Sequence, residues 1–363
     1  MKNFLHRFES LKKFVLQHWL TIAFGLGFVT DFLLLNRVDD TFDNLILLFY
    51  VVLATASLIL FYVAVAERAP TWLLRPLTRF TPITMQYAFG GLLSGMLIFY
   101  GRSGDLLANA PFLLLIISVI LINELVKKRS ERLLYNLSVY FIGVFSYVVL
   151  IIPVWFGVMG DAVFIGSGLV ALLITIGVGN ILIWIIPNFM ALQKRSLVFT
   201  IGCLYMVSNG LYFFNFIPPI PLSLTELGIY QSVERTIDGN YRTVQEYKRW
   251  YERLPVLPLV FHPLSTGGAA CFARIYAPTD LRTTVVHRWE YKDAEGVWRE
   301  HLLYRYDISG ENAGGYRGYT HVQNLKTGRW RCSVENERGQ VLGRRTFTVD
   351  MSVTPQQLVT VFK

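Results

Sequence analysis

The sequence has 363 residues, of which 53% are hydrophobic and 16% charged, and its formal net charge is +9. Soluble domains are somewhat less than half apolar, so this composition argues against a purely soluble protein. A positive charge could indicate nucleic-acid binding, but many of the basic residues stand at the ends of apolar runs, where membrane topology explains them. We therefore expect an integral membrane protein in contact with the lipid bilayer, with no nucleic acid as a partner.

The first part of the chain contains repeated apolar runs of about 20 residues, the length that a helix needs to cross a bilayer. Backbone polar groups have no water partner in lipid, so runs of this length must be helical there. We therefore predict an α-helical membrane bundle of about seven transmembrane helices over residues 1–217. The predicted spans are Val15–Leu35, Asn44–Ala66, Ile83–Tyr100, Leu106–Val126, Leu134–Val154, Val163–Ile186 and Leu197–Ile217.

The distribution of basic residues between these spans predicts the orientation. The N-terminal tail and every second connection after it carry four, three, four and two Lys or Arg residues, thirteen altogether. The alternating connections carry one, one and none. Basic residues concentrate in cytoplasmic loops, so the N-terminus is predicted to be cytoplasmic and the chain after the seventh span to lie outside. This orientation places the C-terminal domain on the far side of the membrane, in a periplasm or outside the cell.

The polar residues of the spans give little indication of transport. Ion-coupled carriers usually hold ionisable groups at mid-membrane, whereas Asp31 and Glu124 are expected near the ends of spans. Deeper polar residues such as Ser94 are neutral, and we interpret them as groups that form hydrogen bonds between helices. Gly91 and Gly95 form a small-xxx-small pair, a pattern typical of close helix packing.

Residues 218–258 are predicted to be a proline-rich and amphipathic connector. Pro218, Pro219 and Pro221 end the seventh helix. Leu222–Val233 is expected to form a short amphipathic helix at the outer surface of the membrane. Tyr241–Leu254, rich in aromatic and charged residues, fits either the membrane interface or a linker that packs against the C-terminal domain.

From about residue 259 the pattern changes to alternation with period two, broken by turn signals. Six short strands with no helix-length gap predict a small antiparallel β-sandwich over residues 259–363, immunoglobulin-like in architecture. The predicted strands are Ala269–Ala277, Thr283–Tyr291, Val297–Tyr306, Gly315–Val322, Arg329–Glu335 and Val341–Val349.

Two of the three cysteines fall on the apolar faces of these strands. Cys271 shares its face with Ala273 and Ile275, and Cys332 shares its face with Trp330 and Val334. In an oxidising compartment they could form a disulfide, while the alternative is a pair of buried reduced thiols. Metal-binding spacings such as CxxC are absent from the sequence, and we expect no metal and no cofactor.

The β domain also offers a candidate recognition surface. His287 and Trp289 share one strand face, and the segment GGYRGY supplies Tyr316, Arg317 and Tyr319. Aromatic rings stack on sugars or apolar groups, and Arg grips carboxylates or phosphates with two donors. The alternative is that these aromatic side chains simply form the core and that His287 has a structural role. Nucleophile-elbow and HExxH motifs are absent from the sequence, so an enzyme is not expected.

The motifs FIPPIPLSLTELGIY, HRWEY, GYRGYTH, GRWRCSVE and VLGRRTF occur in this order over roughly residues 216–349. In these motifs the chain resembles bacterial membrane proteins that carry domain of unknown function twenty-nine fourteen. The resemblance implies a bacterial origin, and hence a bacterial inner membrane as the location, with helices before the domain. It implies no activity or ligand.

Two functions from different classes remain open at this point. The first is a sensory or binding module whose outer β-sandwich engages an envelope component, such as a glycan, a peptidoglycan fragment, a lipid headgroup or a protein. The second is a transporter, channel or lipid-handling protein, in which the helical bundle carries the activity and the outer domain regulates it. A scaffold for an envelope complex is a third possibility.

Overall fold

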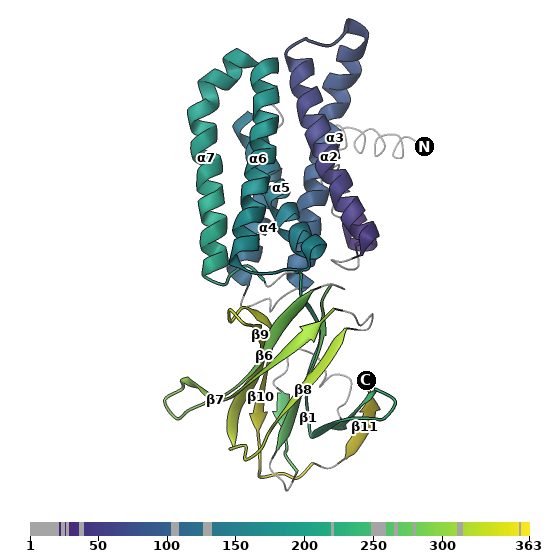
Figure 1. The fold of residues 1–363 in the computed structure, drawn as a ribbon, viewed down its shortest axis with the longest axis vertical. Helices are drawn as coiled ribbons and strands as arrows, with labels where there is room; N and C mark the ends of the chain where they lie inside the picture. Colours follow the sequence, from purple (N-terminus) through teal and green to yellow (C-terminus); the bar gives the residue numbers. More distant parts are fainter. Residues whose placement is uncertain are drawn as a thin grey trace, which may run out of the picture. The chain divides into compact units, whose positions relative to one another are not determined.

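The structure is a computed structural model, and it describes residues 22, 26, 29–35, 40–102, 109–125, 133–218, 221–247, 259–264, 268–278, 281–310, 315–355 and 357–363. The chain divides into a helical unit, which ends at Phe214, and a β unit, which begins at Asn215. Figure 1 shows the helices and strands of both units, coloured by their position in the sequence. The helices are α2 (Thr41–Val65), α3 (Thr71–Arg102), α4 (Ala110–Leu125), α5 (Leu133–Phe156), α6 (Asp161–Ile185) and α7 (Pro187–Phe213).

Five of the described helices, α2, α3, α5, α6 and α7, are long and apolar enough to cross a membrane. They coincide with the second, third, fifth, sixth and seventh predicted spans. Most of the first predicted span lies outside the described residues, and the fourth corresponds to α4, which has only 16 residues. Helix α5 packs against α2, α6 and α7, and it is the most deeply buried of the five.

Two of these helices begin well before the predicted spans. Helix α3 starts at Thr71, and it includes the basic stretch that we expected as a loop. Helix α7 starts at Pro187, which suits the first turn because proline lacks the N–H that is unpaired there. Hydropathy marks only the apolar part of a helix, so a helix that continues beyond the hydrocarbon is underestimated.

The β unit consists of three sheets. Its strands are β1 (Ser223–Tyr230), β2 (Ser232–Arg235), β3 (Tyr241–Glu246), β4 (Leu259–Phe261), β5 (Ala269–Tyr276), β6 (Arg282–Lys292), β7 (Trp298–Ser309), β8 (Tyr316–Val322), β9 (Gly328–Asn336), β10 (Val341–Val349) and β11 (Leu358–Phe362). The sheet orders are β1-β5-β8, β4-β10-β9-β6-β7 and β11-β3-β2. All six predicted strands are confirmed, each with its bounds within three residues.

The three sheets form layers, and the middle sheet β1-β5-β8 is covered on both faces. One face contributes Cys271 to a core with Trp289, Trp330 and Phe347 of the five-stranded sheet. The other face contributes Phe272 to a second core, with side chains from β1, β2 and β3. This double cover explains why neighbouring residues of β5 are buried although they point in opposite directions.

Two expectations about this region are wrong. The segment predicted as an amphipathic helix, Leu222–Val233, contains β1 and the start of β2. Strand β1 has an irregular register between Leu224 and Glu226. Its apolar residues Leu224, Leu227 and Ile229 therefore do not alternate strictly, and their spacing resembles that of an amphipathic helix. Pairing is also not purely antiparallel, because β4 runs parallel to β10. Of the aromatic segment that follows, β3 belongs to the β unit, while residues 248–258 lie outside the described part.

Candidate functional site

The five residues predicted as one recognition surface lie on different faces in the structure. His287 and Trp289 of β6 are both 0% exposed, and they lie between the five-stranded sheet and the middle sheet β1-β5-β8. Tyr316 is half-buried and stacks on Tyr306 of β7, with ring centroids 5.8 Å apart. Arg317 and Tyr319 point to the other side of β8, toward Tyr241 of β3. His287 and Trp289 therefore cannot contact a ligand at the surface in this conformation.

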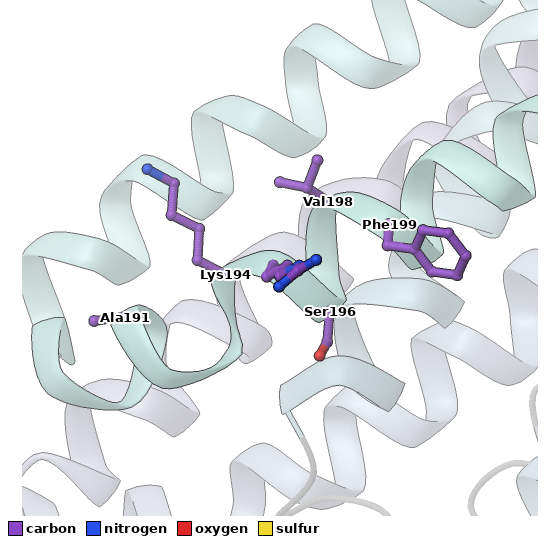
Figure 2. A pocket seen from close by; sticks show the side chains of 6 residues that line it. Ala191, Lys194, Ser196, Val198 and Phe199 are labelled. Atoms are coloured by element: carbon purple, nitrogen blue, oxygen red, sulfur yellow. The ribbon is translucent and has the colours of Figure 1, made fainter.

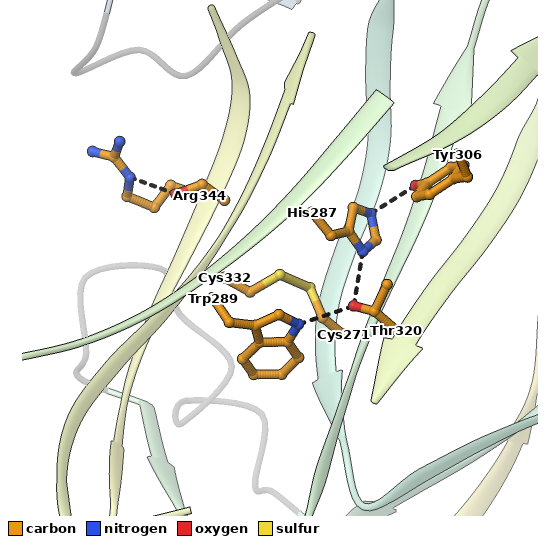
Figure 3. Close-up of a disulfide and its surroundings, with 8 residues drawn as sticks. Cys271, His287, Trp289, Tyr306, Thr320, Cys332 and Arg344 are labelled. Carbon is orange, nitrogen blue, oxygen red and sulfur yellow. Dashed lines mark hydrogen bonds between the residues drawn. A yellow bond between two sulfur atoms is a disulfide. The ribbon is translucent and has the colours of Figure 1, made fainter. Parts of the chain in front are cut away.

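His287 instead belongs to a buried hydrogen-bond network (Figure 3). Its Nδ1 lies 3.1 Å from the hydroxyl of Thr320, and the indole N–H of Trp289 donates to the same hydroxyl at 2.9 Å. The hydroxyl of Tyr306 lies 2.7 Å from Nε2. Burial lowers the pKa of His287 to about 3, so the ring is neutral at neutral pH. Both ring nitrogens are occupied, which gives the residue a structural role.

A disulfide lies beside this network. Cys271 of β5 and Cys332 of β9 are bonded, with their Cα atoms 6.6 Å apart, and the bridge joins the two sheets. The two sulfur atoms and a ring nitrogen of His287 lie within 4.8 Å of one another, close enough to suggest a metal site. However, the sulfurs are bonded to each other and the imidazole nitrogens already have partners. In this state the three residues form a covalent and hydrogen-bonded link across the core.

The face of the middle sheet that points toward β3 carries a more unusual arrangement, a row of charged side chains across its strands. Glu226 of β1 pairs in register with Arg274 of β5, and Arg274 pairs with Arg317 of β8. Lys363 joins the row, because its Nζ lies 2.5 Å from a carboxylate oxygen of Glu226 and its backbone oxygen accepts a hydrogen bond from Arg317 at 3.0 Å. We call Glu226, Arg274, Arg317 and Lys363 the arginine row.

The arginine row holds three positive groups and one negative group. Like charges directly opposite each other on neighbouring strands are unfavourable, so the Arg274–Arg317 pair needs compensation. The nearest carboxylate oxygen of Glu226 is 3.9 Å from Arg274, and it belongs to a residue that also pairs with Lys363. The Nε of Arg274 is buried and has no hydrogen-bond partner among the described residues. The side chains of the row therefore carry more positive than negative charge.

The five-stranded sheet shows the contrast. On its outer face Arg288 pairs with Glu335 at 3.0 Å and also with Glu300. Arg331 forms two hydrogen bonds with Glu290, at 2.5 and 2.8 Å. Each of these two arginines is therefore neutralised by at least one carboxylate on a neighbouring strand. Arg274 differs from these two arginines, because the carboxylate nearest to it, that of Glu226, also pairs with Lys363.

Aromatic rings border the arginine row. The guanidinium of Arg317 lies over the ring of Tyr241 at 5.3 Å, and Tyr241 packs edge-on against Tyr319. The hydroxyl of Tyr241 donates to the backbone oxygen of Arg317 at 3.1 Å. These contacts fix the guanidinium in place, and a planar guanidinium is suited to two-pronged binding of a carboxylate or phosphate.

Sequence patterns identified Arg317 and Tyr319 as candidate site residues, but not Glu226, Arg274, Lys363 and Tyr241. These residues come from β1, β5, β3 and the end of β11, and only the strand register brings them together. Alternation did place Arg274 on the face opposite Cys271. Nothing in the sequence indicated that β8 would be its neighbour.

A surface hollow of the helical unit lies on α7 (Figure 2). Its lining consists of Ala191, Lys194, Arg195, Ser196, Val198 and Phe199. All of these side chains come from a single helix, and no carboxylate, histidine or cysteine is among them. The hollow provides positive charge beside apolar surface and no set of catalytic groups.

The comparisons with known proteins give one informative result. No curated protein matches the chain. Two chains of solved structures match, among them one from "Pseudomonas fluorescens alkylpurine DNA glycosylase AlkC bound to DNA containing an abasic site analog". That likeness covers 87% of this chain and 100% of the other at 11% identity, but its TM-score is only 0.21, and no argument is based on it. The family model "Protein of unknown function (DUF2914)" matches residues 282–349, so the C-terminal region carries the domain that the resemblance predicted.

Proposed function

We propose that the protein is a membrane-anchored binding module whose β unit recognises an anionic group of a cell-envelope component at the arginine row. The observation that carries the proposal is the cross-strand pair of Arg274 and Arg317, which has one shared carboxylate nearby and an unpartnered buried Nε. Glycans with carboxylates, peptidoglycan fragments, lipid headgroups and acidic proteins all carry suitable groups. The proposal keeps Arg317 and Tyr319 from the predicted surface and replaces His287 and Trp289.

The proposed location follows from the charge asymmetry of the sequence. Seven spans with a cytoplasmic N-terminus would put the β unit in the periplasm or outside the cell. The Cys271–Cys332 pairing supports this placement, because disulfides persist in oxidising compartments. A reporter that works only in the cytoplasm, fused after Lys363, should remain silent in bacterial cells. A strong signal would refute the placement.

We propose that the five-stranded sheet and the middle sheet β1-β5-β8 together form an immunoglobulin-like sandwich. A bridge between facing sheets with a buried tryptophan packed against it is a hallmark of that class. Here the Cys271–Cys332 bridge and Trp289 share one core. The third sheet β11-β3-β2 would then be an addition to the sandwich.

Binding can be tested with the full-length protein in lipid nanodiscs. Soluble muropeptides with free carboxylates would be titrated into wild type, Arg317→Gln and Arg274→Gln, and calorimetry would measure the binding affinity of each. A hydrogen bond to a charged group contributes about 1.5–3 kcal/mol, so each substitution should weaken binding by about ten- to a hundredfold. Nanodiscs with anionic lipid in place of the muropeptide test the headgroup alternative.

The matched control is Arg299→Gln on β7. Arg299 has a side chain that is 56% exposed and pairs with Asp293 at 2.9 Å, outside the arginine row. This variant should bind like wild type. Equal affinity of all four proteins for every anionic probe would refute the arginine row as a binding site, and unfolding of the two row variants would assign them a structural role.

A second candidate function places the activity in the helical unit, as a transporter, channel or lipid-handling protein. One observation favours it. We expected Asp31 near the end of a span, but its side chain is 0% exposed and is bound by groups from α2 and α3. Ionisable residues inside membrane bundles commonly mark functional sites.

A further inference from the structure

Asp31 places a carboxyl group inside the helical unit. Its Oδ1 accepts a hydrogen bond from the hydroxyl of Tyr50 on α2 at 2.7 Å, and its Oδ2 contacts the hydroxyl of Ser94 on α3. Both partners are neutral, and no Lys or Arg forms an ion pair with Asp31 in the part of the chain that the structure describes. A buried carboxylate without a counter-ion costs several kcal/mol, so a charged Asp31 would be poorly accommodated here.

Two glycines of α3 make room for this contact. A Cβ atom at Gly91 would lie 2.6 Å from the ring of Tyr50. At Gly95 it would lie 2.7 Å from Leu47 and 3.8 Å from Oδ2 of Asp31. The small-xxx-small pair of the sequence therefore lets Tyr50 and Leu47 of α2 pack closely against the backbone of α3, beside the carboxyl group of Asp31.

The number of hydrogens at Ser94 indicates the protonation state. Its Oγ contacts both Oδ2 of Asp31 and the backbone oxygen of Gly91, the latter at 3.1 Å. A hydroxyl has one hydrogen to donate. An ionised Asp31 would take that hydrogen, and the contact with Gly91 would have none. If Oδ2 is protonated and donates to Ser94, then Ser94 donates to Gly91 and Tyr50 donates to Oδ1, so that each of these three contacts has its own hydrogen.

We propose that Asp31 is a proton-binding site of the helical unit, protonated on Oδ2 in this conformation. Among the residues that the structure describes, the titratable groups facing it are Tyr50 from α2 and Tyr87 from α3. The ring of Tyr87 packs edge-on against that of Tyr50, with ring centroids 5.8 Å apart. Asp43 lies seven residues before Tyr50, about 10 Å along the helix. Release of the proton leaves a negative charge between α2 and α3 and weakens the packing of residues 29–35 against them. This inference is independent of ligand binding by the β unit.

The test is infrared spectroscopy of the full-length protein in nanodiscs, which detects the C=O stretch of protonated carboxyl groups. Wild type at pH 7 should show a band that is lost in Asp31→Asn and kept in Asp161→Asn. Asp161 is a suitable control because a tyrosine hydroxyl, that of Tyr212, also contacts it at 3.2 Å, at the start of α6. As pH rises, the band should disappear while the melting temperature falls, and Asp31→Asn should lack that fall.

A second pair of variants keeps the test valid if Asp31→Asn does not fold. Tyr50→Phe and Ser94→Ala retain the carboxyl group and each remove one of its hydrogen bonds, so each should shift the band of Asp31. A band that neither variant shifts, or a spectrum at pH 7 that is identical in wild type and Asp31→Asn, would overturn the proposal.

Discussion

Thr320→Val should be strongly destabilising, although the two side chains have nearly the same shape. The hydroxyl of Thr320 accepts the indole N–H of Trp289 and also contacts Nδ1 of His287, and both of these residues are 0% exposed. Water cannot replace the lost hydroxyl there. Each buried polar group left unpaired costs about 1–3 kcal/mol, so the expected loss is about 2–6 kcal/mol. That is a large part of the about 5–15 kcal/mol that stabilises a typical domain.

Hydrogen exchange with mass spectrometry of the full-length protein measures this loss in the β unit alone. The opening free energy of peptides from β6 and β9 should fall by about 2–6 kcal/mol, because these strands exchange only when the core opens. Thr284→Val is the matched control. Its hydroxyl donates to Asp307 at 2.7 Å at an exposed position, so its loss should cost under about 1 kcal/mol. Equal effects of the two substitutions would show that the buried network does not contribute stability.

Three further predictions concern the same core. His287 is neutral in the folded protein, and its pKa there is about 3, below its usual value of 6.5. The free energy of unfolding should therefore be highest above about pH 6.5 and should decrease by about 1.4 kcal/mol per pH unit as the pH falls toward 3. In acid titration, His287→Gln should flatten this profile. Non-reducing mass spectrometry should find Cys271 linked to Cys332, and reduction should cost about 4 kcal/mol of unfolding free energy, because the bridge closes a loop with a sequence separation of 61. Gly318→Ala should cost about 1–3 kcal/mol in denaturant titration, because its Cβ would lie 2.7 Å from the hydroxyl of Tyr306.

The six central strands could be predicted because alternation and turn signals are local properties. The shorter or irregular strands beside them could not be predicted in this way. Strands β4 and β11 are only three and five residues long, and the irregular register of β1 disrupts the alternation that would have identified it. Helix ends were missed for a related reason, since hydropathy follows the lipid phase and not the hydrogen bonding of the backbone.

The candidate site shows the same limit more sharply. Alternation correctly separates Cys271 from Phe272, but it does not say which face is solvated, and here both faces of β5 are covered. His287 and Trp289 therefore belong to the core, as the alternative interpretation had it. The Arg274–Arg317 pair depends on β5 and β8 being neighbours, which no local pattern encodes. For Asp31, the position in the sequence suggested a span end, whereas burial is decided by Tyr50 and Ser94 on other helices.

The double cover of the middle sheet has a practical consequence for dividing the protein. The family match begins at residue 282, after β1 and β5, so the recognised segment lacks Cys271 and two of the three strands of that sheet. A fragment cut at residue 259 would keep β5 but lose β1, β2 and β3, leaving Phe272 bare and β11 without its neighbour. The segment that the family model matches is therefore shorter than the set of strands that cover one another, and a fragment that keeps both cores has to begin before Ser223.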